Sequence, residues 1–418
     1  MRMVKLRYHL VFKFLRPIFR LYGRLTFNYH AVLARQVSQD QPILVLSNHT
    51  GILDPFWLAL SFRRPVFFVA SDHIFRLGFV SRIIRWLVAP IPIVKSQMDL
   101  KTIRTIRNVL KDNGIVGLFP EGNTSFTGLS SWISPSTGKL VKQMGCTVLL
   151  YRFHGGYLST PRWALHKRKG IMSGEVVRQL NPDELARMAP QEIQQIILDE
   201  LNMDAFAEQR KGEPIPFKGK KLAENLELTL FVCPKCRQLV TLHSEDDRFF
   251  CSCGLAVRMN VYGFFEPLDS WSLEQASLGS FFDTVASWDN WQRQTLIQML
   301  DEPAVFDWSG QRPIFEDAGQ CLLNCERASR SILMDDGTLA LYTDRLQFTG
   351  RSGKLYQYPV DQISRVITHD PQTLQFTTTL GQVYEVRSKT RRSAYKYIIL
   401  YNLLKQRIDG VPIIFFGI

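Results

Sequence analysis

The chain has 418 residues, of which 45% are hydrophobic and 21% are charged, an ordinary composition for a folded protein of two to four domains. Its net charge is +13, and residues 1–111 carry 18 basic but only 4 acidic side chains, so we expect an anionic partner. No stretch reaches the roughly 18 apolar residues of a membrane span. Four of the seven cysteines are clustered, which argues against a secreted disulfide framework and favours a reducing cytoplasm.

The basic N-terminal segment, residues 1–40, is predicted to lie on a membrane surface. In a helix its basic side chains fall on one narrow stripe, formed by Lys13, Arg16, Arg20 and Arg24. Apolar side chains cover most of the remaining circumference, and such a helix can lie in the headgroup region of a bilayer. Pro17 is the position at which the helix can break in two. The alternative is a basic-faced helix that packs on the following domain.

From residue 42 the chain alternates short apolar runs with helical patterns. We expect strands at 42–49, 63–71, 90–94, 114–119 and 146–153, with helices at 54–62 and 99–112 between some of them. Apolar strands separated by helices predict an α/β domain, a mixed sheet flanked by helices, which we place at residues 41–215. Start signals at Asn181-Pro182 and Ala189-Pro190 predict the helices that close this domain.

The stretch NHTGILDP (48–55) places His49 directly after the first of these strands. Asp54 and Pro55 are predicted to be the N-cap and the first residue of a helix. An offset of five residues can then bring the Asp54 carboxylate back to the imidazole. A carboxylate on one ring nitrogen fixes the tautomer and makes the other nitrogen a better base, so His49 can take a proton from a hydroxyl. No Ser or Cys nucleophile stands at a matching spacing, so the acceptor hydroxyl itself is expected to attack.

A second marked stretch, FPEGNTS (119–125), follows the apolar run GIVGL. NHTGILD resembles the N-H-x-x-x-x-D signature of the glycerolipid acyltransferase family, which includes the 1-acylglycerol-3-phosphate acyltransferases. FPEGNTS resembles that family's F-P-E-G-T-R-S block. The order and separation of the two motifs also agree with the family, and the resemblance covers roughly residues 1–215.

The resemblance implies transfer of a fatty acyl group from acyl-CoA or acyl-carrier protein to the free hydroxyl of a lysophospholipid. The expected acceptor is 1-acylglycerol 3-phosphate and the expected product is phosphatidic acid. The resemblance also implies that His49 is the general base, that Asp54 orients it, and that no organic cofactor is needed. The residues it implies in substrate binding are Asn48, Glu121, Gly122, Asn123, Thr124, Ser125 and, before the middle helix, Lys95.

One position departs from the family pattern. Where the family block carries an arginine, whose planar fork can bind a phosphate at two points, this chain has Thr124. A hydroxyl supplies one hydrogen bond and no charge. Either another cation serves, or the acceptor phosphate is held less firmly, or the acceptor lacks a terminal phosphate. Besides Lys95, the candidate cations are Lys139, Lys142, Arg152 and Arg162.

After a Pro/Gly-rich linker at 211–221, the motifs CPKC and CSCG bring together four cysteines: Cys233, Cys236, Cys251 and Cys253. Two close thiolate pairs across a hairpin are typical of a structural zinc ribbon with closed tetrahedral ligation, which we place at residues 216–268. Iron and labile disulfides are the alternatives. Residues 231–265 carry four basic and three acidic side chains, so they lack the basic footprint of a nucleic-acid-binding module.

An aromatic helical connector is predicted at residues 269–303. From 304 to 418, alternating patterns with glycine turns predict antiparallel strands followed by one helix, which suits a pleckstrin-homology-like barrel. Near the start of that helix the sequence RSKTRRSAYK clusters five cations, Arg387, Lys389, Arg391, Arg392 and Lys396. They either bind anionic lipid headgroups or form a solvated helix face.

The sequence therefore predicts a peripheral or monotopic acyltransferase at the cytoplasmic face of the cell membrane. Its expected partners are the anionic membrane surface, the lysophospholipid acceptor and the acyl thioester donor, with no nucleic acid. The rival hypothesis is a non-catalytic lipid-binding scaffold that lost its acceptor chemistry with the missing arginine, although a scaffold has no need of the His49–Asp54 pair. An acyltransferase for another lysolipid is a further alternative, and nucleic-acid binding through the zinc ribbon ranks third.

Overall fold

The computed structural model describes residues 3–34, 40–71, 74–75, 78–93, 99–325 and 331–410. The chain forms two compact units, which divide between Gly219 and Lys220, although the short segment Trp163–His166 clusters with the second unit. Lys95 and the apolar end of the chain, 411–418, lie outside the described residues. Within the described ranges, no helix has both the length and the apolar character needed to cross a membrane. The domain boundaries expected from the sequence stay predictions.

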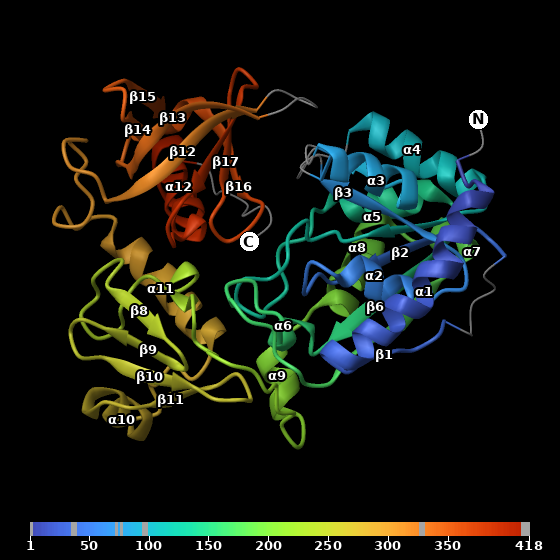
Figure 1. The fold of residues 1–418 in the computed structure, drawn as a ribbon, viewed down its shortest axis with the longest axis horizontal. Helices are drawn as coiled ribbons and strands as arrows, with labels where there is room; N and C mark the ends of the chain where they lie inside the picture. Colours follow the sequence, from blue (N-terminus) through green and yellow to red (C-terminus); the bar gives the residue numbers. More distant parts are fainter. Residues whose placement is uncertain are drawn as a thin grey trace. The chain divides into compact units, whose positions relative to one another are not determined.

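The first unit is built on a seven-stranded sheet in the order β1-β7-β6-β2-β5-β3-β4 (Figure 1). All neighbouring strands are parallel except β6 and β7, so the sheet is mixed. The strands are β1 (Tyr29–Ala31), β2 (Ile43–Ser47), β3 (Val66–Ser71), β4 (Ile91–Ile93), β5 (Ile115–Leu118), β6 (Thr147–His154) and β7 (Met172–Leu180). The helices are α1 (Leu6–Phe27), α2 (Asp54–Ala59), α3 (Phe79–Val88), α4 (Leu100–Lys111), α5 (Ser136–Met144), α6 (Gly156–Ser159), α7 (Pro182–Arg187), α8 (Pro190–Leu201) and α9 (Ala205–Arg210).

Both faces of the sheet are covered, and the central strand β2 is buried on each side. Leu44 and Leu46 lie in a core that includes side chains of α4, α5 and α8. Ile43 and Val45 point the other way, into a core that includes Trp57 of α2. Because neither face of β2 meets water, its sequence is apolar from Ile43 to Leu46. The predicted fold class of this unit, a mixed sheet flanked by helices, is confirmed.

Strand β7 is absent from the sequence-based expectation. It pairs antiparallel with β6 and parallel with β1, and its sequence, MSGEVVRQL, is only partly buried. A strand near the edge of a sheet can carry several polar side chains, so it lacks the apolar run by which the central strands were recognised.

The N-terminal helix α1 is a single helix. It runs from Leu6 to Phe27 through Pro17, so the expected break is absent. Proline removes one backbone hydrogen bond to the carbonyl four residues earlier, but Pro17 is exposed and water can serve that carbonyl instead. Tyr8 and Phe27 are buried against the unit, so α1 packs on the domain as well as presenting an outer face.

The second unit contains two antiparallel sheets. The smaller has the order β11-β10-β9-β8 and the larger β15-β14-β13-β12-β18-β17-β16. The smaller is formed by β8 (Leu242–Glu245), β9 (Arg248–Cys251), β10 (Ala256–Met259) and β11 (Phe265–Pro267), the larger by β12 (Phe315–Cys325), β13 (Ser331–Leu341), β14 (Arg345–Gly350), β15 (Leu355–Pro359), β16 (Ile363–Thr368), β17 (Leu374–Thr378) and β18 (Val383–Ser388). The helices are η2 (Leu226–Leu228), α10 (Ser270–Ser277), α11 (Val285–Met299), η3 (Val360–Gln362) and α12 (Ala394–Asp409). Antiparallel strands closed by one helix were expected, and the pleckstrin-homology-like assignment stays a prediction.

Helix α11 connects the two sheets of this unit. On one side the Trp288 indole donates to the Val232 carbonyl at 3.0 Å, beside the first cysteine pair. On the other side Asp289 accepts a hydrogen bond from the buried Tyr395 hydroxyl of α12 at 3.0 Å. The predicted zinc ribbon, connector and C-terminal domain therefore form one packed body.

The cations of the basic cluster at 387–396 have partners within the second unit. Arg391 forms ion pairs with Glu224 and Glu227 at 2.9 and 3.0 Å, and the buried Lys396 pairs with Asp317 at 2.9 Å. The remaining cations also have internal partners: Arg387 contacts Glu385, Lys389 contacts Asp336, and Arg392 donates to the Gln372 and Val386 carbonyls. Arg392 and Lys396 are buried, so the cluster is not a uniformly solvated face, and binding of anionic lipid headgroups by it stays a prediction.

Candidate active site

The two motifs meet because their strands are parallel neighbours in the sheet. In the register between β2 and β5, Leu46 lies opposite Leu118. His49 and Glu121 each follow three residues later, at the carboxyl ends of their strands. The His49 backbone N–H accordingly donates to the Glu121 Oε1 atom at 3.0 Å, and the Ser125 N–H donates to the His49 carbonyl at 3.2 Å. The predicted catalytic and acceptor motifs thus form one site.

His49 and Asp54 form a hydrogen-bonded pair, with 3.0 Å between Nδ1 and Oδ2. The Asp54 side chain is fully buried and also accepts from the backbone N–H groups of Thr50 and Gly51, at 2.6 and 2.9 Å. Asp54 is the first residue of α2 and Leu53 is its N-cap, so the predicted N-cap role of Asp54 is wrong. Its carboxylate instead closes the loop back onto the imidazole.

The imidazole of His49 has one face covered and one nitrogen open. Its ring stacks on Phe119, with 4.3 Å between the ring centroids and an interplanar angle of 22°. The side chain is 18% exposed, and Nε2 has no hydrogen-bond partner within the described ranges. Since Asp54 occupies Nδ1, Nε2 is the nitrogen that can accept a proton from a bound hydroxyl.

Glu121 is a buried carboxyl beside this pair. Besides the His49 N–H, it accepts the Ser131 N–H at 2.7 Å. Burial raises the pKa of Glu121 from its ordinary value of 4.5 to about 8, and the nearby Asp54 charge also raises it, while the two N–H donors act in the opposite direction. Glu121 therefore joins the loop after β5 to the His49 backbone and to the chain at Ser131.

The other residues implied by the motifs have different surroundings. Asn48 is fully buried and exchanges two hydrogen bonds with the Phe153 backbone of β6. The Ser125 hydroxyl donates to the Leu129 carbonyl at 2.6 Å. Gly122 is exposed with a φ of 72°, and Asn123 is buried. Asn48 and Ser125 thus hold the loops in place, and a substrate-binding role for these residues stays a prediction.

Arg162 reaches the position at which the expected arginine is missing. It donates from Nη1 to the Thr124 carbonyl at 3.1 Å, and its guanidinium lies 4.1 Å from the centroid of the Phe126 ring. It follows α6, which packs so closely on the His49 loop that a Cβ atom at Gly156 would overlap the Thr50 hydroxyl. A cation from a separate part of the chain therefore lies against the second motif.

The other candidate cations lie elsewhere or have internal partners. The Lys142 ammonium donates to the Met188 carbonyl at 2.5 Å, and Arg152 donates to the Glu200 carbonyl at 2.8 Å. Lys139 is exposed on α5. Of these four candidates, Arg162 is the one that contacts the FPEGNTS loop.

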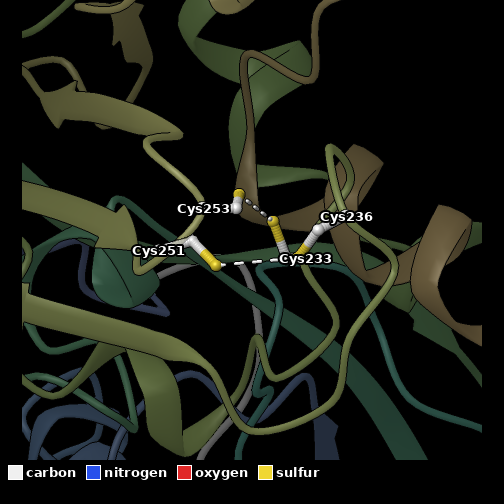
Figure 2. A group of neighbouring side chains, drawn as sticks. All are labelled: Cys233, Cys236, Cys251 and Cys253. Carbon is white, nitrogen blue, oxygen red and sulfur yellow. Dashed lines mark hydrogen bonds between the residues drawn. The ribbon is translucent and has the colours of Figure 1, made fainter.

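The four cysteines of the second unit form a compact cluster at the turns next to β9 (Figure 2). Their sulfur atoms all lie within 4.8 Å of one another. The Cys233–Cys253 and Cys236–Cys251 sulfur pairs are 3.6 and 3.8 Å apart, beyond the length of a disulfide. A tetrahedron with zinc–sulfur bonds of about 2.3 Å has sulfur–sulfur edges of about 3.8 Å, so these residues fit a tetrahedral metal ion.

The site thus consists of a mixed α/β sheet with a histidine at a strand end whose imidazole is oriented by a buried carboxylate, an arrangement that can take a proton from a bound hydroxyl. Residues 30–151 match the protein-family model Acyltransferase. The family resemblance found in the two motifs is thereby confirmed.

Comparison with solved structures gives 23 matching chains, two of which have the following similarity to this chain. One is the 1-acyl-sn-glycerophosphate (LPA) acyltransferase PlsC from Thermotoga maritima, 17% identical, with a TM-score of 0.39 and coverage of 48% of this chain and 80% of that chain. The other is the C-terminal domain of an unknown protein from Leishmania infantum, 17% identical, with a TM-score of 0.17 and coverage of 22% and 85%. No curated protein matches the chain.

The raised pKa of Glu121 has a consequence for stability. The folded chain keeps this proton up to about pH 8, whereas the unfolded chain loses it near its ordinary pKa of 4.5. Between these values the unfolded state binds fewer protons, so the Glu121 contribution to stability falls as the pH rises. Thermal melts measure the unfolding temperature of the wild type minus that of Glu121→Gln. We expect this difference to fall as the pH rises from about 5 to about 8. A constant difference across this range would contradict the prediction.

Proposed function

We propose that the chain transfers a fatty acyl group from acyl-CoA or acyl-carrier protein to the free hydroxyl of a lysophospholipid, 1-acylglycerol 3-phosphate, giving phosphatidic acid. The observation that carries this proposal is the His49–Asp54 pair, with Nδ1 bonded at 3.0 Å and Nε2 open, within an acyltransferase-family segment. A scaffold that only bound lipid would gain nothing from burying a charged carboxylate behind an imidazole.

The proposed step balances without a cofactor. As the acceptor oxygen attacks the thioester carbonyl carbon, its proton moves to the Nε2 atom of His49. The tetrahedral intermediate then collapses, the carbon–sulfur bond breaks, and the departing sulfur takes the proton back from His49. The buried Asp54 carboxylate stabilises the imidazolium between these two transfers.

For the acceptor, Arg162 is proposed as the cation that replaces the missing arginine. Its guanidinium contacts the Thr124 carbonyl in the second motif, so its positive charge would lie close to a phosphate bound at this loop. This assignment favours an acceptor with a free phosphate over one with a capped phosphate.

The proposed site of action is the cytoplasmic face of the cell membrane, with an anionic surface as the partner. Support comes from exposed apolar side chains on α1 and α3, such as Phe14 at 70% and Phe79 at 72% exposure. Ile52, in the loop after His49, is 86% exposed. Phe56 of α2 stacks on Phe19 of α1 at 4.6 Å between centroids, so apolar side chains extend from α1 to the catalytic loop.

We further propose that the four cysteines hold a structural zinc ion. Thiolate sets of this kind bind zinc in closed tetrahedral sites, where the ion stabilises the fold and leaves no position for a substrate. The cluster belongs to the second unit and includes no residue of the His49 site.

The first test of the function is acyl transfer from labelled acyl-CoA, and from acyl-carrier protein, to 1-acylglycerol 3-phosphate. We expect His49→Ala to lose activity by about a thousandfold, because the general base is removed, and Asp54→Asn by about a hundredfold. His30→Ala removes an exposed histidine and is the control. Full turnover in His49→Ala would refute the mechanism. Vesicle binding by the wild type without turnover on any acceptor would favour the scaffold.

The role of Arg162 is tested by steady-state kinetics on two acceptors, 1-acylglycerol 3-phosphate and a lysolipid with a capped phosphate. We expect Arg162→Ala to raise the KM for the free phosphate, lowering kcat/KM by about ten- to a hundredfold, because charge-assisted hydrogen bonds are lost. Arg162→Lys should restore part of the loss, since it keeps the charge without the fork. Lys139→Ala serves as the control. Equal losses on both acceptors would indicate a structural role only.

Metal analysis tests the cysteine cluster. We expect one zinc ion per chain, and we expect Cys236→Ser to lose the ion and lower the unfolding temperature, because the metal contributes folding free energy. Cys321→Ser, which changes a thiol outside the cluster, should retain zinc. Absence of bound metal from the wild-type protein, or full retention of zinc in Cys236→Ser, would refute this assignment.

A further inference from the structure

The basic stripe of α1 lines a groove of about 560 Å³ on the first unit. Five cationic side chains meet there, four from α1 and one from the segment after α2: Lys13, Arg16, Arg20, Arg24 and Arg63. Phe12 and Leu21 add apolar walls. Within the described ranges, no Asp or Glu side chain lines the groove.

The cations in the groove repel one another. Burial lowers the pKa of Arg16, and repulsion from Arg20 and Arg63 lowers it further. One Arg16 nitrogen donates to the Leu60 carbonyl at 3.1 Å, while its buried Nε atom has no hydrogen-bond partner among the residues that the structure describes. An anion in the groove would relieve the repulsion and supply acceptors for these N–H groups.

Beside the groove, α1 carries a ridge of exposed apolar side chains. They recur every three or four residues and so lie on one helix face: Leu6, Leu10, Phe14, Ile18, Leu21 and Leu25. At 3.6 residues per turn, this face adjoins the basic stripe. Leu21 belongs both to the ridge and to the groove wall. A ligand that joins an anionic group to an apolar chain would match the two surfaces together.

We propose that this groove binds the phosphate of an anionic phospholipid in the bilayer, whose acyl chains lie along the apolar ridge. This inference rests on the membrane-surface part of the proposed function and adds a defined lipid site to it, apart from the acceptor site at His49. A soluble anion would use only the cations and leave the ridge in water. An acidic protein segment could pair with the cations, but the apolar ridge beside them would offer no partner for its charged side chains.

The test is co-sedimentation with vesicles of phosphatidylcholine alone and of phosphatidylcholine mixed with phosphatidylglycerol. The groove variant is Arg20→Gln with Arg24→Gln, since both side chains are exposed and their loss leaves the fold intact. The control is Lys111→Gln with Lys139→Gln, which removes the same charge from exposed positions on α4 and α5. We expect the groove variant to bind anionic vesicles about thirtyfold more weakly, and the control variant less than about threefold.

The outcomes separate this inference from the proposed function. Equal losses of vesicle binding in the two variants would mean that the charges act only by diffuse electrostatic attraction, and this result would overturn the groove site. Saturable binding of inorganic phosphate in calorimetry, with unchanged vesicle binding by the groove variant, would assign the groove to a soluble anion and also overturn it. Wild-type protein that binds neither vesicle type would refute the membrane-surface proposal itself. Acyl transfer to detergent-dispersed acceptor should be unchanged in the groove variant, and its loss would count against a separate lipid site.

Discussion

The parallel pairing of β2 with β5 is the constraint on which the candidate site depends. A register that sets Leu46 opposite Leu118 brings His49 and Glu121 together at the same sheet edge. A slip of one residue would point every side chain of a strand to the other face, breaking both cores along with the site. The apolar side chains on both faces of β2 therefore fix the register that the catalytic loop needs.

The sequence was sufficient for the local parts of this arrangement. His49 and Asp54 are five residues apart, and the loop between them is short enough for the spacing itself to predict their contact. Glu121 was implied by the resemblance of FPEGNTS to the family's F-P-E-G block. Phe119, which stacks on the His49 ring, stands in the same motif, but its role depends on how two strands pair. No pattern in the sequence marked Ser131 as a partner of Glu121.

What the sequence misjudged or left open depends on tertiary packing, which brings together residues that are distant in the chain. Arg391 and Lys396 looked like a basic patch because Glu224 and Asp317 lie far away in the chain. Arg162 could be named only as one candidate of several, because nothing local shows that its guanidinium contacts Thr124. Pro17 failed to break α1 because its side of the helix is exposed, which depends on tertiary packing.

The position of α11 determines how the C-terminal half of the chain can be divided. Its Gln292 side chain accepts a hydrogen bond from the Phe231 N–H, and its Asp289 carboxylate meets Tyr395. A truncation at residue 303, where the sequence suggests a boundary, would leave Asp289 buried without the Tyr395 hydroxyl. It would also remove Arg391, the ion-pair partner of Glu224. Fragments for separate expression are therefore better divided near Gly219 than at any point between the cysteine cluster and α12.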